Sequence, residues 1–377
     1  MKVSLPNSNG KMLPYKLVGE PLVIRKPKKP FNRIAFAAAH VVADPRRENA
    51  IDWKGTIAYR RHLLNLGFGI AEAMDTSQRG MGLSWPDALE LVKRSLDDAG
   101  AENAKKIYSG CGTDHIEDAA SLDDVIAAYL TQLHAIQKLG GRIILMASRT
   151  LVRVAKTPED YVKVYSRVLQ EADHPVVLHW LGPMFDSALR GYWGVEDFPS
   201  AMNVALRVIN ENTRKVDGIK ISLLDADKEI IMRQSLPASV KMYTGDDFNY
   251  AYLIAGDAKG YSHALLGIFD AIAPAASVAL SALADDKHDK FHAVLAPTVP
   301  LSRLIFQAPT QFYKTGIVFL AWLNGYQDHF VMVNGAQSAR SILHFAEVFR
   351  LADQANLLRK PDLAAKRMKQ LLAIYGA

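Results

Sequence analysis

Short apolar runs alternate with amphipathic stretches over residues 32–275 of this 377-residue chain. Eight of these runs have the length and composition of buried strands: 33–39, 69–74, 106–109, 142–147, 176–179, 218–222, 241–243 and 261–267. A stretch with apolar residues at helical spacing follows each run. Regular alternation favours parallel βαβ units, and eight such units close a TIM barrel. The pattern therefore predicts an α/β fold, a (β/α)8 barrel.

The two ends of the chain depart from this alternation. Asn9-Gly10 lies between two short apolar segments, which indicates a hairpin, so residues 1–31 are expected to form an N-terminal arm. After Pro274 the spacing is helical only, and residues 276–377 are expected to form a helical region packed on the barrel or on a second subunit. A doubly wound open sheet is the competing fold, but no Gly-x-Gly-x-x-Gly follows the first strand.

Composition narrows the class of protein. Hydrophobic residues make up 49% and charged residues 22%, as in ordinary globular domains. The net charge of +6 is scattered, and the one compact basic cluster, Arg25–Pro30, is interrupted by prolines, so no nucleic-acid partner is expected. No apolar run is long enough to span a membrane, and a single cysteine, Cys111, excludes an intramolecular disulfide. We expect a cytoplasmic protein with a small-molecule substrate.

One lysine stands within the sixth predicted strand, between Ile219 and Ile221. Lysine is almost never fully buried, and burial lowers the pKa of its ammonium and frees a nucleophilic amine. Functional residues of a barrel lie at the C-terminal ends of its strands. We therefore expect Lys220 to form a Schiff base with a substrate carbonyl. The alternative is a lysine that points to solvent at the strand end.

Other polar residues follow the predicted strands at the same end of the barrel. The candidates for substrate binding there are Thr76, Ser77, Arg149, Ser222, Gly245, Asp246 and Gly267. Asp246 and Asp247 are also expected to cap the next helix and hold its loop. The long aromatic loop 180–198 is expected to roof the site or to pack on a neighbouring subunit.

Three segments carry a family resemblance. They are Gly218-Ile219-Lys220, Tyr243-Thr244-Gly245-Asp246-Asp247 and Leu178-His179-Trp180-Leu181-Gly182-Pro183. With them, residues 32–325 resemble a divergent branch of the dihydrodipicolinate synthase and N-acetylneuraminate lyase family of class I aldolases. The resemblance implies an aldolase, lyase or hydro-lyase that acts on a 2-keto acid or sugar-derived keto acid through an imine on Lys220. It also implies no metal or cofactor, and a homodimer or homotetramer.

The chain departs from that family in the residues around the lysine. The Thr-Thr-Gly-Glu loop that holds the keto-acid carboxylate is replaced by residues 75–80, where Asp75 adds a like charge. The family's proton-relay tyrosine has no counterpart near Arg149, which stays protonated and is expected instead to clamp an anion. His179 is the first candidate for the missing acid or base, followed by His40 and His115.

Two other functions remain open from the residues alone. The first is a metal-dependent barrel lyase or isomerase that uses His40, Glu72, Asp75, His115 and His179, although no tight ligand spacing supports it. The second is a non-catalytic barrel that binds its ligand reversibly.

Overall fold

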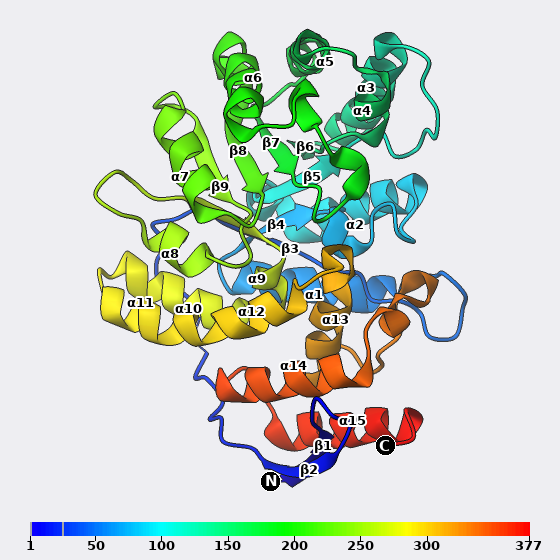
Figure 1. The fold of residues 1–377 in the computed structure, drawn as a ribbon, viewed down its shortest axis with the longest axis vertical. Helices are drawn as coiled ribbons and strands as arrows, with labels where there is room; N and C mark the ends of the chain where they lie inside the picture. The colour runs from blue at the N-terminus through cyan, green and yellow to red at the C-terminus, as the bar shows by residue number, and fades with distance from the viewer. Residues whose placement is uncertain (1, 25) are drawn as a thin grey trace.

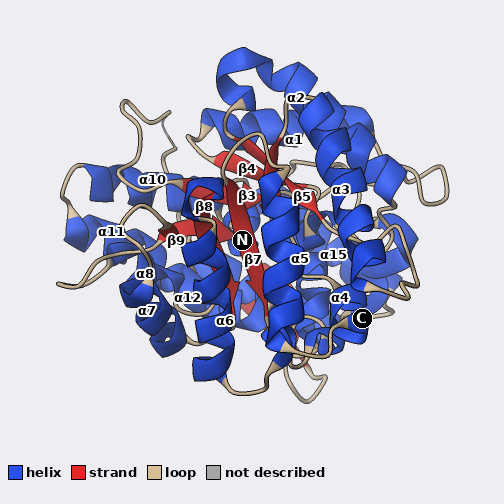
Figure 2. Ribbon diagram, turned by 90° about the horizontal axis from the view of Figure 1, so that it is seen from above, coloured by secondary structure: helices blue, strands red, loops and turns tan. Residues whose placement is uncertain are grey.

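Eight parallel strands close into a barrel in the computed structural model, which describes residues 2–24 and 26–377. Met1 and Arg25, the first residue of the basic cluster, lie outside the described residues. The barrel strands are β3 (Ala35–Ala38), β4 (Gly69–Glu72), β5 (Ile107–Cys111), β6 (Arg142–Leu145), β7 (Val176–Leu181), β8 (Val216–Ser222), β9 (Lys241–Thr244) and β10 (His263–Leu266). β10 pairs with β3 and closes the ring, which helices surround (Figures 1 and 2). The (β/α)8 barrel predicted from the alternation is confirmed.

Helices of the βα units pack around the outside of the ring (Figure 2). They are α1 (Trp53–Asn65), α2 (Trp85–Ala104), α3 (Leu122–Lys138), α4 (Arg149–Val154), α5 (Pro158–Gln170), α6 (Phe198–Glu211), α7 (Ala226–Ser235), α8 (Tyr250–Ala255), α9 (Ile268–Ala271) and α10 (Ala273–Ala284). Their starts follow local sequence chemistry. Ser121, for example, accepts from the backbone N–H of Asp124 and begins α3 with a capping box.

The C-terminal region adds five helices: α11 (His288–Leu295), α12 (Val299–Ile305), α13 (Tyr313–Leu323), α14 (Ile342–Gln354) and α15 (Pro361–Ile374). Short 3-10 turns are η1 (Asp75–Ser77), η2 (Ser187–Leu189), η3 (Tyr192–Gly194), η4 (Thr213–Lys215), η5 (Ala296–Thr298), η6 (Thr310–Phe312) and η7 (Val333–Ala339). Every residue of α13 is buried, so this helix is part of the core. Among the described residues, no helix is both long and apolar enough to cross a membrane.

The two ends of the chain meet away from the barrel. β1 (Lys2–Pro6) and β2 (Met12–Lys16) form an antiparallel hairpin beside α14 and α15 (Figure 1). Asp353 of α14 accepts hydrogen bonds from the Tyr15 hydroxyl at 2.8 Å and from the backbone N–H groups of Val18 and Gly19 at 2.8 and 3.1 Å. These three bonds hold the arm on the C-terminal helices.

Apolar side chains fill the inside of the barrel. The layer consists of Phe36, Ala38, Ala71, Met74, Tyr108, Ile144, Val177, Tyr243 and Leu265. The residue of β8 in this layer is Gly218. A larger residue would not fit there, since a Cβ at this position would lie 2.6 Å from the Tyr243 ring. Side chains two residues apart on a strand share a face, so Lys220 also points inward, nearer the C-terminal end of the barrel.

A buried ion pair fixes α1 to the barrel. Arg60 donates from Nη2 to Glu72 Oε1 at 2.7 Å and from Nε to Oε2 at 3.0 Å, and neither side chain is exposed by more than 2%. Ser95 and the backbone N–H of Ala73 donate to the same carboxylate. Glu72 is therefore a structural residue that anchors the end of β4.

Removing the charge of Glu72 should leave the Arg60 guanidinium buried without its counterion. We expect Glu72→Gln to lower the free energy of unfolding by about 3 kcal/mol or more. Glu90→Gln is the matched control, since Glu90 pairs with Arg94 at the surface and should cost no more than about 0.5 kcal/mol. Urea unfolding measures both, and equal effects would contradict an anchoring role for the buried pair.

Candidate active site

Lys220 projects into a small cavity at the C-terminal end of the barrel, and only 8% of the residue is exposed. The cavity has a volume of about 20 Å³ and is lined by Ala38, Met74, Asp75, Thr76, Leu181, Phe185, Lys220, Ser222, Asp247, Gly267, Phe306 and Tyr313. We call it the inner cavity. Its walls come from the strands, from the loops after them and from the C-terminal region.

The amine of Lys220 lies above the apolar interior of the barrel. Burial lowers the pKa of Lys220, and the carboxylates of Asp247 and Asp75 partly oppose that shift. Gly245 makes room for the lysine, because a Cβ there would lie 2.7 Å from Lys220 Cε and 2.3 Å from Ser222 Oγ. A lysine held in this way presents a free amine at a lower pH than an exposed one does.

Asp247 is the second ionisable group of the inner cavity. The backbone N–H of Ile268 donates to its Oδ1 at 2.9 Å and orients the carboxyl group. Burial raises the pKa of Asp247 to about 7, and Lys220 partly opposes the shift. A carboxyl group with that pKa can both give and take a proton near neutral pH.

Tyr313 reaches the inner cavity from the first residue of α13. Its hydroxyl lies 2.7 Å from Thr76 Oγ1 of η1, and its ring stacks on Phe306 with the centroids 4.4 Å apart. Burial raises the pKa of Tyr313 well above its usual value, so the phenol stays protonated. A helix from outside the eight βα units thus supplies a hydroxyl beside the lysine.

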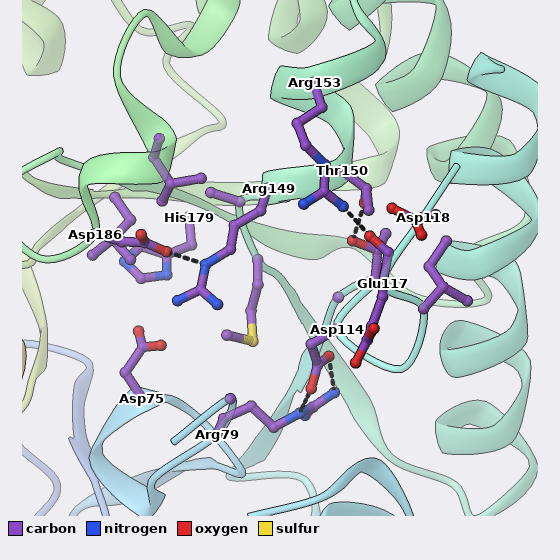
Figure 3. Close-up of a pocket in the computed structure, with 18 residues that line it drawn as sticks. Asp75, Arg79, Asp114, Glu117, Asp118, Arg149, Thr150, Arg153, His179 and Asp186 are labelled. Carbon is purple, nitrogen blue, oxygen red and sulfur yellow. Dashed lines mark hydrogen bonds and ion pairs between the residues drawn. The ribbon is translucent and has the colours of Figure 1, made fainter. Parts of the chain in front are cut away.

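A larger cavity of about 530 Å³ adjoins the inner one, and we call it the outer cavity (Figure 3). Asp75 and Leu181 line both cavities, so the two meet at these residues. The charged side chains of its wall are Asp75, Arg79, Asp114, Glu117, Asp118, Arg149, Arg153 and Asp186. A ligand larger than a few atoms would extend from the lysine into this space.

The arginines of the outer cavity already have partners (Figure 3). Arg79 is buried and binds both carboxylate oxygens of Asp114, at 2.6 and 2.8 Å. Arg149 donates from Nε to Asp186, and its guanidinium lies over the cavity. Arg153 donates to the backbone carbonyl of Glu117. The other donors of Arg79 bind Gln132 and the carbonyls of Ala73 and Gly110, so Arg79 has none left for a ligand. Only part of the Arg149 and Arg153 guanidinium groups is engaged.

His179 lies on β7 directly opposite Lys220 in the strand register and lines the outer cavity. Its Nε2 is 3.2 Å from Ser222 Oγ, while its buried Nδ1 has no partner among the described residues. Burial, assisted by Lys220, holds the pKa of His179 well below its ordinary value. The imidazole is thus neutral near pH 7 and offers one nitrogen to a ligand or water.

A family model described as "Protein of unknown function (DUF993)" matches residues 3–377. The chain belongs to this family. No curated protein matches it.

Solved structures similar to this DUF993 chain are dihydrodipicolinate synthases. The 4-hydroxy-tetrahydrodipicolinate synthase of Methylacidiphilum fumariolicum SolV is 16% identical with a TM-score of 0.67, over 88% of this chain and 99% of that one. The Thermotoga maritima synthase is 16% identical with a TM-score of 0.66 (88% and 100%). The Acinetobacter baumannii synthase, described as complexed with pyruvate, is 17% identical with a TM-score of 0.65 (86% and 99%). The resemblance seen in the sequence is thus confirmed at the level of the fold.

The residues predicted for the site are distributed over several places in the DUF993 chain. Lys220, Thr76, Ser222 and Gly267 line the inner cavity, and Gly245 lies against the lysine stem. His179 and Arg149 line the outer cavity. Ser77 and Asp246 line neither cavity: Ser77 donates to the Met74 carbonyl, and Asp246 accepts from the backbone N–H groups of Phe248 and Asn249.

Eight of the twelve residues that line the inner cavity are absent from the predicted site, and three of these matter most for its chemistry and shape: Asp247, Phe306 and Tyr313. Asp247 was expected only to hold its loop, and neither Phe306 nor Tyr313 was considered. The sequence held one indirect signal, the segment from Ala308 to Lys314, which stands where the related family has a proline-rich turn. Nothing in its spacing shows that Tyr313 reaches back to the second barrel loop.

Three of the five candidate metal ligands are held by other protein groups. His40 Nδ1 lies 2.8 Å from Asp270 Oδ2 and its Nε2 lies 3.2 Å from Gln327 Oε1, while His115 Nδ1 lies 2.9 Å from Gln132 Nε2. Glu72 is bound by Arg60. Within residues 2–24 and 26–377, no three His, Cys, Asp or Glu side chains are grouped closely enough to hold a metal ion.

The lowered pKa of Lys220 predicts its chemical reactivity. A lysine with a lowered pKa deprotonates at lower pH, so its labelling by cyanate should reach half its maximal rate at lower pH. Lys93 is the reference, because it is exposed and Asp97 raises its pKa. We expect the Lys220 midpoint to lie at the lower pH of the two, measured by mass spectrometry of the two peptides. Coincident midpoints would mean that Lys220 is solvated like a surface lysine.

Proposed function

We propose that this protein is an imine-forming, class I aldolase, lyase or hydro-lyase in which Lys220 attacks the carbonyl carbon of a small substrate. The observation that carries the proposal is a desolvated lysine at the C-terminal end of a barrel, in one cavity with an aspartic acid whose pKa is near 7. No metal or other cofactor has a role in this reaction. The synthases with a similar fold support the reaction class.

The first step joins the Lys220 nitrogen to the carbonyl carbon. The amine attacks as the free base, and the carbonyl oxygen becomes a hydroxyl group. Loss of that hydroxyl as water needs a proton, and Asp247 in its acid form can donate it. The phenol of Tyr313, hydrogen-bonded to Thr76, can stabilise the same oxygen while it leaves. The product is a protonated imine on Lys220.

The protonated imine then acts as an electron sink. In an aldolase or lyase, the bond between the carbon next to the imine and the following carbon breaks, and its electron pair moves toward the nitrogen to give an enamine. In a hydro-lyase, loss of a proton from the carbon next to the imine gives the enamine, which then expels a hydroxyl group from the following carbon as water with a donated proton. Protonation of the enamine and attack of water on the imine return the free lysine and the carbonyl product. Asp247 as carboxylate, or His179 through its free nitrogen, can accept protons in these steps.

The family resemblance bears on which carbonyl compound reacts with Lys220. The sequence resemblance implies a 2-keto acid or sugar-derived keto acid, and the A. baumannii synthase is described as complexed with pyruvate. The inner cavity of this chain is lined by the acidic side chains of Asp75 and Asp247, which disfavour the binding of such a carboxylate.

Borohydride trapping tests the imine directly. Incubation with a panel of ketones, aldehydes and 2-keto acids followed by reduction should add the mass of the reduced carbonyl compound to the Lys220 peptide. Lys220→Met should abolish this adduct. Lys314→Met is the matched control, since Lys314 is also buried, its pKa is lowered to about 8, and it lines neither cavity. An adduct that persists undiminished in Lys220→Met would end the proposal.

Asp247→Asn tests the proton donor. The amide cannot donate a carboxyl proton, so imine formation should slow by about 10²-fold or more. In the wild type the acid form of Asp247 is lost as pH rises through about 7, which should produce an alkaline limb that the variant lacks. Asp246→Asn is the control, because an amide oxygen can still accept the two loop N–H groups. Equal rates for the two variants would remove Asp247 from the mechanism.

A further inference from the structure

The two cavities at the barrel mouth are acidic, although the chain as a whole carries a net charge of +6. Six carboxylic side chains line them: Asp75, Asp114, Glu117, Asp118, Asp186 and Asp247. Four cationic side chains oppose these: Arg79, Arg149, Arg153 and Lys220. The surroundings of the proposed substrate thus have the opposite sign of charge to the rest of the molecule.

The imbalance is greatest where the carbonyl would react. Asp75 and Asp247 line the inner cavity, and Lys220 is its only cationic lining residue among those the structure describes. Lys314 lies nearby, but it lines neither cavity and donates instead to the Gln311 carbonyl at 3.0 Å and to Met81 Sδ at 3.1 Å. No arginine faces this space within residues 2–24 and 26–377.

A 2-keto acid fits this arrangement poorly. Its carboxylate is bonded directly to the carbon that Lys220 would attack, so it must enter the inner cavity beside Asp75 and Asp247. The carboxylate of Asp75 repels it where water is largely excluded, and Asp247 adds to this repulsion once it has given up its proton. The usual benefit of that carboxylate, a negative charge next to the protonated imine, is already supplied here by the two aspartates.

The outer cavity favours hydroxyl groups for the same reason. Carboxylates accept hydrogen bonds from hydroxyls, and Glu117 and Asp118 line this wall together with Thr113 and Thr150. Arg79 and Arg149 are paired with Asp114 and Asp186, which leaves Arg153 as the one cation of this wall without a carboxylate partner among the described residues. A volume of about 530 Å³ has room for a chain of several carbons that carry hydroxyl groups.

From these charges we propose that the substrate is an uncharged polyhydroxylated ketone or aldehyde, with a hydroxyl-bearing carbon rather than a carboxylate next to the carbonyl. This inference rests on the proposed imine on Lys220 and narrows its substrate class. Asp75 accepts the hydroxyl beside the carbonyl, and the rest of the chain extends into the outer cavity, where Glu117 and Asp118 accept further hydroxyls.

The test is borohydride trapping with matched pairs of carbonyl compounds. Hydroxyacetone and pyruvate differ only in a CH₂OH group against a carboxylate, and D-fructose and 2-keto-D-gluconate differ in the same way. Rates of adduct formation on Lys220 are divided by those with Nα-acetyl-lysine amide, which removes intrinsic reactivity. We expect the uncharged member of each pair to react at least about tenfold faster.

Two variants assign the preference to the inner cavity. Asp75→Asn removes the negative charge and keeps the shape of the side chain. The ratio of the pyruvate rate to the hydroxyacetone rate should therefore rise about tenfold. Glu90→Gln, at the surface and outside both cavities, should leave the ratio for this short pair unchanged. Urea unfolding curves that match the wild type show that both variants are folded.

The possible failures are distinguishable. If the wild type prefers pyruvate and 2-keto-D-gluconate, or if Asp75→Asn leaves the ratio unchanged, the substrate class proposed here is wrong while the imine on Lys220 stands. If neither these four compounds nor the wider panel gives an adduct on Lys220, the proposal that Lys220 forms an imine is wrong. The proposed substrate class is then wrong as well.

Discussion

Burial of one amine inside a closed barrel is the constraint on which this structure depends. An isolated ammonium group taken out of water is costly, and the protein meets that cost by lowering the pKa of Lys220 and by placing carboxyl groups beside it. Neighbouring positions are fitted to the lysine. Gly218 leaves space for Tyr243 below it, and Gly245 leaves space for its stem. The apolar barrel interior keeps water from its lower side.

The C-terminal region completes the site that the barrel begins. Eight βα units bring Lys220, Asp247 and Thr76 to one end of the barrel, but the side of the inner cavity that faces them is formed by Phe306 and Tyr313. Their rings stack, and Tyr313 belongs to α13, a helix that is buried along its whole length. The phenol is therefore held by core packing, in addition to its bond with Thr76. Helix α13 is thus both a part of the C-terminal extension and a part of the candidate site.

The sequence predicted the barrel and its lysine because both depend on local periodicity. Alternation of strands and helices fixes the number of βα units, and the period of two along a strand places Lys220 and Ser222 on one face. The sequence pattern could not show which loop residues point into the cavity, since that depends on the geometry of each turn. Ser77 and Asp246 turn to backbone groups, whereas their neighbours Thr76 and Asp247 line the cavity. Tyr313 meets Thr76 across 237 positions of sequence, which no periodicity records.

The position of Asp75 links the departures from the related family into one physical account. A protonated imine needs a negative charge nearby, and a 2-keto acid brings that charge with it. In this chain Asp75 stands at the boundary of the two cavities and Asp247 stands beside the lysine, so the protein carries the counterion itself. Arg149 lines the outer cavity and is paired with Asp186. Under the proposed substrate class, the altered loop at residues 75–80 and the acidic mouth have one physical explanation. A site that supplies its own anion would not need an anionic substrate and would repel one.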